Sequence, residues 1–280
     1  LSLLRTQSQM ASTTSSSPSA TRNRSAKLLP TFNYLDLHIW SFILPFGSIA
    51  GSILISIIFH YEDVTGTHCR VHNWLPTISA AVGNNAPEKY LFRFGIGLYT
   101  TIKLIIDITS FVMLKALREH KKIKFGTLPY TDSQFNLWNR VSIVLVVLED
   151  LCLVTLTMIS SSDDVDIHTG SFSGFMIFAH IHFITCLLAN KYARSPLSDE
   201  ERHWYRMRVG FALAHVSAFA MAVYLYWRHN EYCEPGIYSL FALCEYTIVA
   251  MNICFHGMSL FEWRHLKYVV RDHNLVGKEE

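Results

Sequence analysis

Six long apolar runs divide this chain, and they limit its fold more than any other feature does. They cover about residues 38–60, 91–114, 135–160, 171–190, 207–227 and 237–261. Each run is near the ~20 residues that a helix needs to cross ~30 Å of hydrocarbon. A soluble bundle would show an apolar stripe on each helix, whereas these segments are apolar all round. The runs therefore predict an all-α, polytopic membrane bundle of six transmembrane helices.

Basic residues fall almost entirely in alternate gaps between these runs. The segments before the first run and after the second, fourth and sixth, together with the first residues of the runs that follow them, hold nineteen of them: Arg5, Arg22, Arg24, Lys27, Lys115, Arg118, Lys121, Lys122, Lys124, Arg140, Lys191, Arg194, Arg202, Arg206, Arg208, Arg264, Lys267, Arg271 and Lys278. The other gaps hold three, Arg70, Lys89 and Arg228. Because cytoplasmic segments are enriched in Lys and Arg, we expect both termini to be cytoplasmic.

This topology divides the chain into three parts. Residues 1–33 contain a polar run of Ser and Thr, with too little apolar surface to fold alone, and are expected to form a disordered cytoplasmic head. Residues 34–265 form the six-span domain, and residues 266–280 form a cytoplasmic tail. The charged fraction is 16%, against ~25% for an ordinary soluble domain, and the net charge of +2 gives no indication of nucleic-acid binding.

Two of the six cysteines, Cys69 and Cys233, fall in the gaps expected to be non-cytoplasmic. Disulfides form in such oxidising compartments, so the pair suggests a bridge between the first and last of these gaps. The sequence does not supply the Cα–Cα distance that a disulfide requires.

The same three gaps are rich in ionisable side chains. Solvation explains their carboxylates but does not require histidines, and the candidate histidines are His60, His68, His168 and His229. Three interpretations remain open: structural hydrogen bonding at the loop ends, a histidine–carboxylate acid/base site, and a zinc site. The candidate carboxylates are Glu62, Asp63 and Asp164. No spacing matches a local zinc motif such as HExxH, so we expect no resident metal.

Several polar residues lie inside the predicted spans, where ionisable groups turn inward and pair. Lys103 and Asp107 are one helical turn apart and can form an i,i+4 pair. The others are Glu149, Asp150, His180, His182, Glu245, Asn252 and His256. They could hold the bundle together, for example by pairing Lys103 with Glu149 or His182 with Glu245. Alternatively, they could line a polar pocket or a proton path.

Several segments closely resemble the post-GPI-attachment-to-proteins factor two family, a branch of a superfamily that includes the DRAM-type lysosomal proteins. These segments are Leu44-Pro45-Phe46-Gly47; residues 60–81, including Asn73-Trp74-Leu75-Pro76; Ser160-Ser161-Ser162-Asp163-Asp164 with Ile167-His168; Arg228-His229-Asn230-Glu231-Tyr232-Cys233-Glu234 with Gly236-Ile237-Tyr238; and Glu245-Tyr246. The likeness covers about residues 35–265.

The resemblance implies a multi-pass protein of the Golgi membrane, or also of the endoplasmic reticulum membrane, that remodels the lipid of glycosylphosphatidylinositol (GPI) anchors. In that pathway an unsaturated sn-2 chain is removed and a saturated chain is attached, and the family is tied to the reacylation. The implied partners are GPI-anchored proteins, membrane lipids and other GPI-remodelling proteins, with no nucleic acid. We expect no cofactor beyond acyl-CoA or a phospholipid as acyl donor.

We expect His68 or His168 to act as general base on the sn-2 hydroxyl of the lyso-lipid, and Asp164 or Asp63 to orient it. A slot ending near Glu245 holds the acyl chain, and Arg70 or Arg228 holds the anchor phosphate. The candidate substrate-binding residues are His60, Glu62, Arg70, Arg228, His229, Glu245 and Glu149.

No segment matches the HxxxxD pattern of glycerolipid acyltransferases, so the sequence leaves open whether the chain is an enzyme or supports one. The alternatives are a non-enzymatic lipid-binding scaffold, a DRAM-like regulator of membrane traffic, and a transporter or channel that uses Lys103, Asp107 and Glu149. A transporter would be expected to show repeated halves or spans broken by Gly and Pro. Pro45-Phe46-Gly47 is the only such interruption within a span.

Overall fold

Six helices of the structure are long and apolar enough to cross a membrane, which confirms the predicted bundle. The structure is a computed structural model that describes residues 31–263 and 267–269. The six are α1 (Tyr34–Phe59), α4 (Glu88–Phe125), α5 (Asp132–Met158), α6 (Val165–Arg194), α7 (Asp199–Tyr232) and α8 (Ile237–Gly257), which α9 (Ser259–Trp263) extends.

The remaining elements are short. Helices α2 (Tyr61–Thr65) and α3 (Ile78–Gly83) lie in the connection between α1 and α4, and β1 (Thr31–Asn33) pairs with β2 (Lys267–Val269). Apart from these two strands, the predicted head and tail lie outside the described residues. So do Arg5, Arg22, Arg24, Lys27, Arg264, Arg271 and Lys278.

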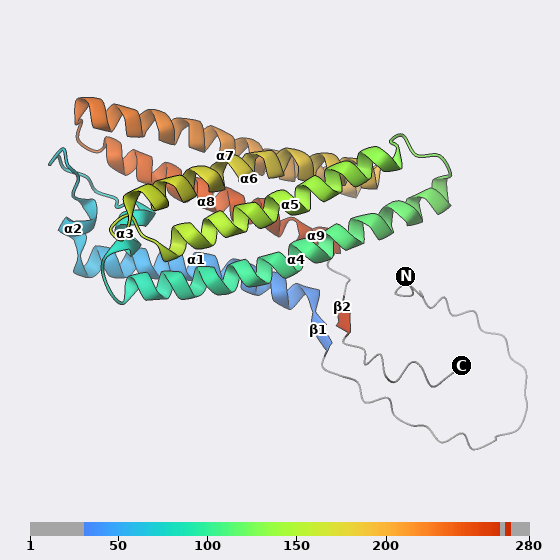
Figure 1. Ribbon diagram of the computed structural model, residues 1–280, viewed down its shortest axis with the longest axis horizontal. Coiled ribbons are helices and arrows are strands. Elements are labelled where there is room, and N and C mark those ends of the chain that lie inside the picture. Colours follow the sequence, from blue (N-terminus) through green and yellow to red (C-terminus); the bar gives the residue numbers. More distant parts are fainter. Residues whose placement is uncertain (1–30, 264–266, 270–280) are drawn as a thin grey trace, which may run out of the picture. The chain divides into compact units, whose positions relative to one another are not determined.

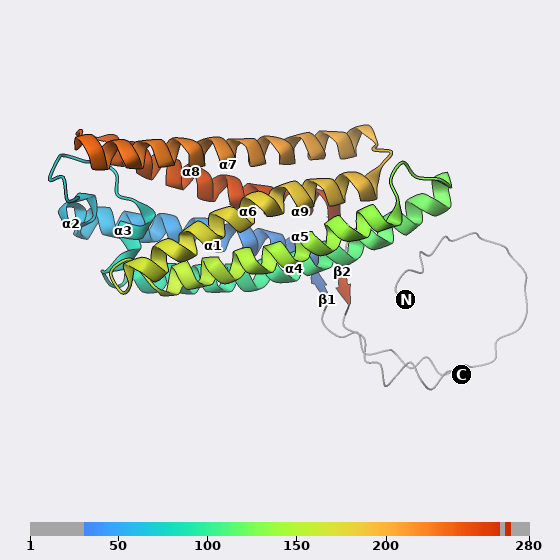
Figure 2. The same ribbon diagram turned by 45° about the horizontal axis from the view of Figure 1, so that its top comes forward.

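The spans pair as three helical hairpins: α1 with α4, α5 with α6, and α7 with α8 (Figures 1 and 2). The hairpins place the connections at two ends. One end holds residues 60–87, 159–164 and 233–236, and we name it the disulfide end; the other holds residues 126–131 and 195–198, and we name it the basic end. The membrane orientation of these ends is a prediction from the charge pattern.

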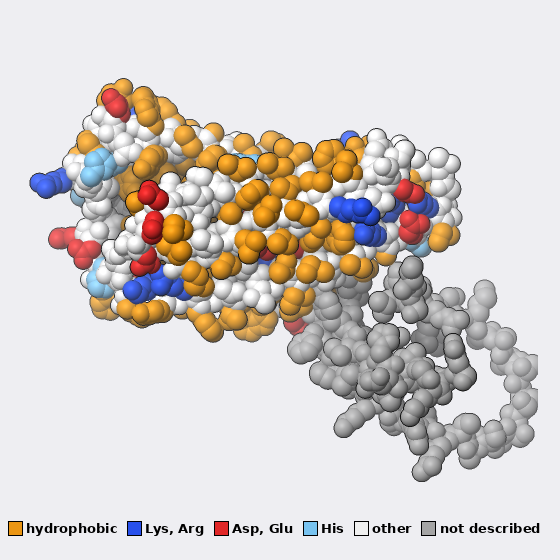
Figure 3. Space-filling model, in the orientation of Figure 1, with side chains coloured by type: hydrophobic (Ala, Val, Ile, Leu, Met, Phe, Trp, Pro, Cys, Tyr) orange, Lys and Arg blue, Asp and Glu red, His pale blue; other side chains and the backbone are white. Residues whose placement is uncertain are grey.

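Side chains on the surface follow the same division. In the space-filling view, hydrophobic side chains cover the middle of the visible face, and charged side chains gather toward the two ends (Figure 3). Large apolar residues such as Leu54, Val144 and Ile184 are about 60% exposed. Exposed apolar side chains in the middle of long helices match a lipid environment, since water would penalise them.

Helix α4 continues well beyond the predicted run and ends at Phe125. Its last turns carry basic side chains that form ion pairs with other helices. Arg118 Nε donates to Asp132 Oδ1 at 2.9 Å, and Lys121 Nζ donates to Glu201 Oε2 at 2.9 Å. These bonds tie α4 to the first turns of α5 and α7, so hydropathy underestimated the length of a helix that ion pairs stabilise at the basic end.

Glycine permits a close approach between α1 and α4 at Gly95. A Cβ atom at Gly95 would lie 2.3 Å from Ser48 Cβ, well inside van der Waals contact. Ser48 is buried, and its Oγ donates to Pro45 O at 3.2 Å, so this side chain has little room to move. Helix α1 continues through Pro45.

The ionisable side chains inside the spans pair differently from the sequence prediction. Lys103 Nζ bonds to Asp107 at 3.1 Å, as the i,i+4 spacing predicted, but its second partner is Asp150 at 2.8 Å rather than Glu149. Glu149 bonds instead to Asn252 and His256. His182 and Glu245 also have other partners: Ser142 O and Ile78 N respectively.

Candidate functional site

Hydrogen bonds hold the short helix α3 at its own N-cap, to α8 and to α1, which gives its side chains defined positions. Thr77 caps it, accepting from Ala80 N at 3.1 Å. Ile78 N donates to Glu245 Oε2 on α8 at 3.2 Å, and Ser56 Oγ on α1 donates to Ala81 O at 2.5 Å. A six-residue helix is too short to be stable alone, so these tertiary bonds hold it in place.

The chain leading into α3 is bonded to α8 as well. Trp74 N and Leu75 N both donate to Ser239 Oγ, at 2.8 and 3.0 Å. Tyr246 OH donates to Pro76 O at 2.5 Å. These contacts connect residues more than 160 positions apart and align the start of α3 with the first half of α8.

His168 lies in the first turn of α6, and its ring has two partners. Nδ1 lies 2.8 Å from Ile159 O, and Nε2 lies 3.1 Å from Ser79 Oγ on α3. A carbonyl oxygen only accepts, so Nδ1 carries the proton of the neutral ring and Nε2 accepts from the Ser79 hydroxyl. This is the geometry of an activated nucleophile: a serine bonded to a base that a third group orients.

Asp164 has a role other than orienting this ring. Its side chain accepts from Asp166 N at 3.0 Å and Ile167 N at 2.9 Å, so it caps α6, and the Ile159 carbonyl orients His168 instead. The neighbouring Asp163 accepts hydrogen bonds from Ser160 and pairs with Arg93 at 2.9 Å. The bonds from Ser160, assisted by Arg93, hold the pKa of Asp163 below its usual value.

Two cavities share Ser79 and His168 in their walls. One has a volume of about 530 Å³ and lies among α3, α6, α7 and α8. The other has a volume of about 90 Å³ and lies among α1, α3, α4, α5, α6 and α8. Both are lined mainly by apolar side chains, and both also contain Phe172, Glu245 and Ile248. The serine–histidine pair therefore lies in the walls that two apolar-lined cavities share, and the Glu245 carboxylate also lines both.

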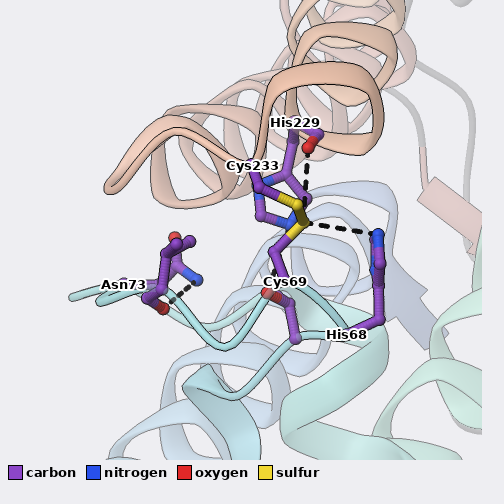
Figure 4. Close-up of a disulfide and its surroundings, with 7 residues drawn as sticks. His68, Cys69, Asn73, His229 and Cys233 are labelled. Atoms are coloured by element: carbon purple, nitrogen blue, oxygen red, sulfur yellow. Dashed lines mark hydrogen bonds between the residues drawn. A yellow bond between two sulfur atoms is a disulfide. The ribbon is translucent and has the colours of Figure 1, made fainter.

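The predicted disulfide between Cys69 and Cys233 is present, with a Cα–Cα distance of 5.3 Å (Figure 4). It joins the α1–α4 connection to the end of α7. His68 Nε2 lies 3.3 Å from Cys69 Sγ, and His229 is buried with its Nε2 3.2 Å from Thr67 Oγ1. Figure 4 shows both histidine rings beside the bridge, so His68 and His229 belong to the surroundings of the disulfide.

The other predicted site residues are distributed around the disulfide end. His60 Nε2 lies 3.5 Å from the buried carboxylate of Glu88. Arg228 donates to both oxygens of Glu234, at 2.7 and 3.0 Å, and these bonds lower the pKa of Glu234. Glu62, Asp63 and Arg70 are exposed, and Glu149 is buried within the spans. Of the predicted residues, His168 and Glu245 are thus the two that line the shared cavities.

Ser79 was not among the candidate residues, although it completes the arrangement around His168. It lies two positions after Thr77, and it has only the ordinary appearance of a serine in the first turn of a helix. Its partner is 89 residues away in the sequence. No local spacing signals such a pair, whereas the histidine itself was visible from the polar gap.

Comparisons with known proteins agree on one family. The model of the "Frag1/DRAM/Sfk1/Cwh43P N-terminal domain" family matches residues 33–266. The chain is 41% identical to "Post-GPI attachment to proteins factor 2" of Caenorhabditis briggsae, over 76% of this chain and 79% of that protein. It is 30% identical to "Acyltransferase PGAP2" of Xenopus tropicalis, over 88% of this chain and 94% of that protein. No solved structure matches the chain.

Proposed function

Because the chain belongs to the post-GPI attachment to proteins factor 2 family, within the Frag1/DRAM/Sfk1/Cwh43P N-terminal domain family, we propose that it remodels the lipid of GPI anchors. The reaction that its site fits best is transfer of a saturated acyl chain to the sn-2 hydroxyl of a lyso-GPI. The single observation that carries this proposal is the hydrogen bond between Ser79 and His168, placed where two apolar-lined cavities adjoin.

In the first half of the reaction, Ser79 Oγ attacks the carbonyl carbon of the acyl donor while its proton passes to His168 Nε2. The donor is an acyl thioester or a phospholipid. Its bond from the acyl carbon to the leaving sulfur or oxygen breaks, and His168 returns the proton to that atom. The chain is then held as an ester on Ser79.

In the second half, the sn-2 hydroxyl oxygen of the lyso-GPI attacks the ester carbon. His168 takes the hydroxyl proton and returns it to Ser79 Oγ as the bond between Ser79 and the acyl group breaks. The Ile159 carbonyl holds the imidazole in the tautomer that both halves need, because it accepts from Nδ1. Asp164 contributes by capping the helix that carries His168.

The two cavities supply places for the two lipid chains. The cavity of about 530 Å³ has walls from α6 and α7, including Val223 and Thr169, and suits a lipid that enters from between these helices. The smaller cavity runs among span residues such as Leu153 and Ile253, and its volume of about 90 Å³ has room for only part of an acyl chain. Glu245 accepts from Ile78 N, the residue before Ser79, and its carboxylate can also accept a hydrogen bond from a hydroxyl of the acceptor lipid.

At the disulfide end, Arg70 is the more suitable partner for the anchor phosphate, because Arg228 is already paired with Glu234. His60, Glu62, Asp63, His68 and His229 surround the connection that leads to α3 and would support the headgroup or the loop itself. Their part in this proposal is positional rather than chemical.

The disulfide end faces the lumen in this proposal, and both termini are cytoplasmic, with a head at 1–33 and a tail at 266–280. Two independent features support the orientation: the basic residues gather at the opposite end, and a disulfide needs an oxidising compartment. The lumenal leaflet of the Golgi, or of the endoplasmic reticulum, is where GPI-anchored proteins display their lipid. Those proteins, and other GPI-remodelling proteins, are the proposed partners.

The test is rescue of cells that lack their own family member, read out by the mass of the anchor lipid on a GPI-anchored reporter. The wild-type chain should restore two saturated chains. Ser79→Ala and His168→Ala should each lower conversion at least ~10²-fold, the usual contribution of a positioned base. Ser171→Ala, a serine on the same helix as His168, and His203→Ala, at the basic end, are the matched controls.

A second measurement addresses the covalent step. Incubation of the purified protein with an acyl thioester should add the mass of one acyl chain to the wild type and none to Ser79→Ala. If Ser79→Ala restores the anchor lipid as well as the wild type does, the serine is not the nucleophile. If the correctly localised wild-type chain leaves the anchor unchanged, the remodelling proposal itself fails, and a lipid-binding scaffold becomes the better interpretation.

A further inference from the structure

Within the spans, helices α5, α6 and α8 bring together three buried side chains that the acyl-transfer proposal does not use. These are Glu149, His182 and His256, and one ligand atom from each lies within 4.8 Å of the other two. Glu149 is fully buried, and the two histidines are 4% and 8% exposed. We propose that this His–His–Glu cluster binds one divalent transition-metal ion, with Zn²⁺ as the best match.

Both histidine rings are oriented as metal ligands are. His182 Nδ1 lies 3.0 Å from Ser142 O, so it donates its proton there and leaves the lone pair of Nε2 available. His256 Nδ1 lies 3.6 Å from Asp107 Oδ1, and its Nε2 points to Glu149. Metal-binding histidines almost always donate their second N–H to a carbonyl or a carboxylate, and this cluster has one of each.

The carboxylate is only partly hydrogen-bonded, and an ion bound by one or both of its oxygens would complete its set of partners. Glu149 Oε1 accepts from Asn252 Nδ2 at 3.0 Å and lies 3.2 Å from His256 Nε2. Glu149 Oε2 is buried and has no hydrogen-bond partner among the described residues. An unpaired carboxylate oxygen inside a bundle is costly, and a bound cation would satisfy it.

The spacing also suits zinc. Tetrahedral zinc with bonds of about 2.0–2.1 Å holds neighbouring ligand atoms about 3.3 Å apart. The distance of 3.2 Å between Glu149 Oε1 and His256 Nε2 matches this value. A cavity of about 50 Å³, lined by both histidines, provides room for a water molecule as the fourth ligand.

Charge balance points in the same direction. Three carboxylates of the described spans, Asp107, Glu149 and Asp150, lie around the ammonium of Lys103, which bonds to two of them. With neutral histidines the group carries a net charge of minus two, in a region where uncompensated charge is strongly disfavoured. One divalent cation neutralises it. The competing arrangement is a protonated His256 shared between Asp107 and Glu149, without a metal.

The ion would connect three helices from two of the hairpins, α5 and α6 from one and α8 from another. Its residues differ from Ser79 and His168, so the metal proposal and the acyl-transfer proposal can fail independently.

The test uses the full chain, purified with a streptavidin-binding tag in nanodiscs, saturated with Zn²⁺ and washed, with metal content measured by elemental mass spectrometry. The wild type should retain one zinc per chain. Glu149→Gln and His256→Ala should each lower retention at least tenfold, and Asp107→Asn should weaken affinity 10–100-fold. The control is His215→Ala, a buried histidine of α7 that bonds to His180 and should leave retention unchanged.

A measurement on the wild type alone guards against variants that fail to fold. Co²⁺ added to metal-free protein should produce the intense visible absorption of a four-coordinate cobalt site, which Zn²⁺ then removes. If the wild type retains less than a tenth of a zinc per chain and shows no such absorption, the metal site is absent and the shared proton explains the cluster. Equal loss of metal from His215→Ala and Glu149→Gln would also overturn the assignment.

Discussion

Removing the Cys69–Cys233 disulfide should destabilise the bundle by an amount that depends on the length of chain between the two cysteines. The two cysteines are separated by 164 residues, so the bridge closes a loop that includes α3 and the whole of α4, α5, α6 and α7. For a free chain, the entropy of closing such a loop corresponds to about 5 kcal/mol at 25 °C. Spans that stay inserted already restrict the unfolded chain, so we expect a loss of about 2–4 kcal/mol, the range typical of native disulfides.

The perturbation is the double variant Cys69→Ser with Cys233→Ser, which leaves no unpaired thiol at the bridge. Its midpoint of thermal unfolding in nanodiscs should fall by about 4–16 °C relative to the wild type, and dithiothreitol should lower the wild type by the same amount. The control is Cys152→Ser, a free cysteine of α5, which should respond to dithiothreitol as the wild type does. A double variant within 1 °C of the wild type would show that the bridge does not constrain the unfolded state.

Two further predictions concern stability. Gly95→Ala should lower the free energy of unfolding by about 1–3 kcal/mol, because its Cβ would overlap Ser48. Gly47→Ala is the control and should change the free energy of unfolding far less, since there is open space around Gly47. Equal effects of the two variants would contradict the close approach of α1 and α4. Because the pKa of Asp163 is lowered in the folded state, its contribution to stability is present above its unfolded pKa of about 3.8 and is lost as the pH falls through the lowered value. Asp163→Asn should therefore flatten the acid side of a stability-against-pH curve, and an unchanged curve would refute this.

The six spans could be predicted because a membrane helix must satisfy its backbone internally and present apolar side chains to lipid, and both demands are local in sequence. The disulfide could be predicted because two cysteines, Cys69 and Cys233, fall in the gaps expected to be non-cytoplasmic. The pair of Ser79 with His168 could not be predicted, because it depends on α3 being fixed by bonds from α1 and α8 that no local pattern reveals.

The buried cluster of Glu149, His182 and His256 could not be predicted from the sequence for a similar reason. The absence of a local zinc motif led us to expect no resident metal, but that argument applies only to ligands close together in the chain. Glu149, His182 and His256 come from three helices and meet only when α5 and α6 form one hairpin and α8 packs beside it. Hydropathy identified each of them as an inward-facing group and gave no information about which partner each would meet.

One side chain connects the two proposed sites and gives the last prediction. Asn252 lines the smaller cavity, and its Nδ2 donates to Glu149 Oε1 at 3.0 Å. Asn252→Ala should release this carboxylate and weaken zinc binding about 10–100-fold, as loss of a bond to a metal ligand usually does. Asn139→Ala, which removes a buried amide that bonds to Phe111 O on α4, is the control. If zinc retention falls in Asn252→Ala but not in Asn139→Ala, the bond from Asn252 to Glu149 supports the metal site. If zinc retention is unchanged in Asn252→Ala, the carboxylate does not need this bond to hold the ion.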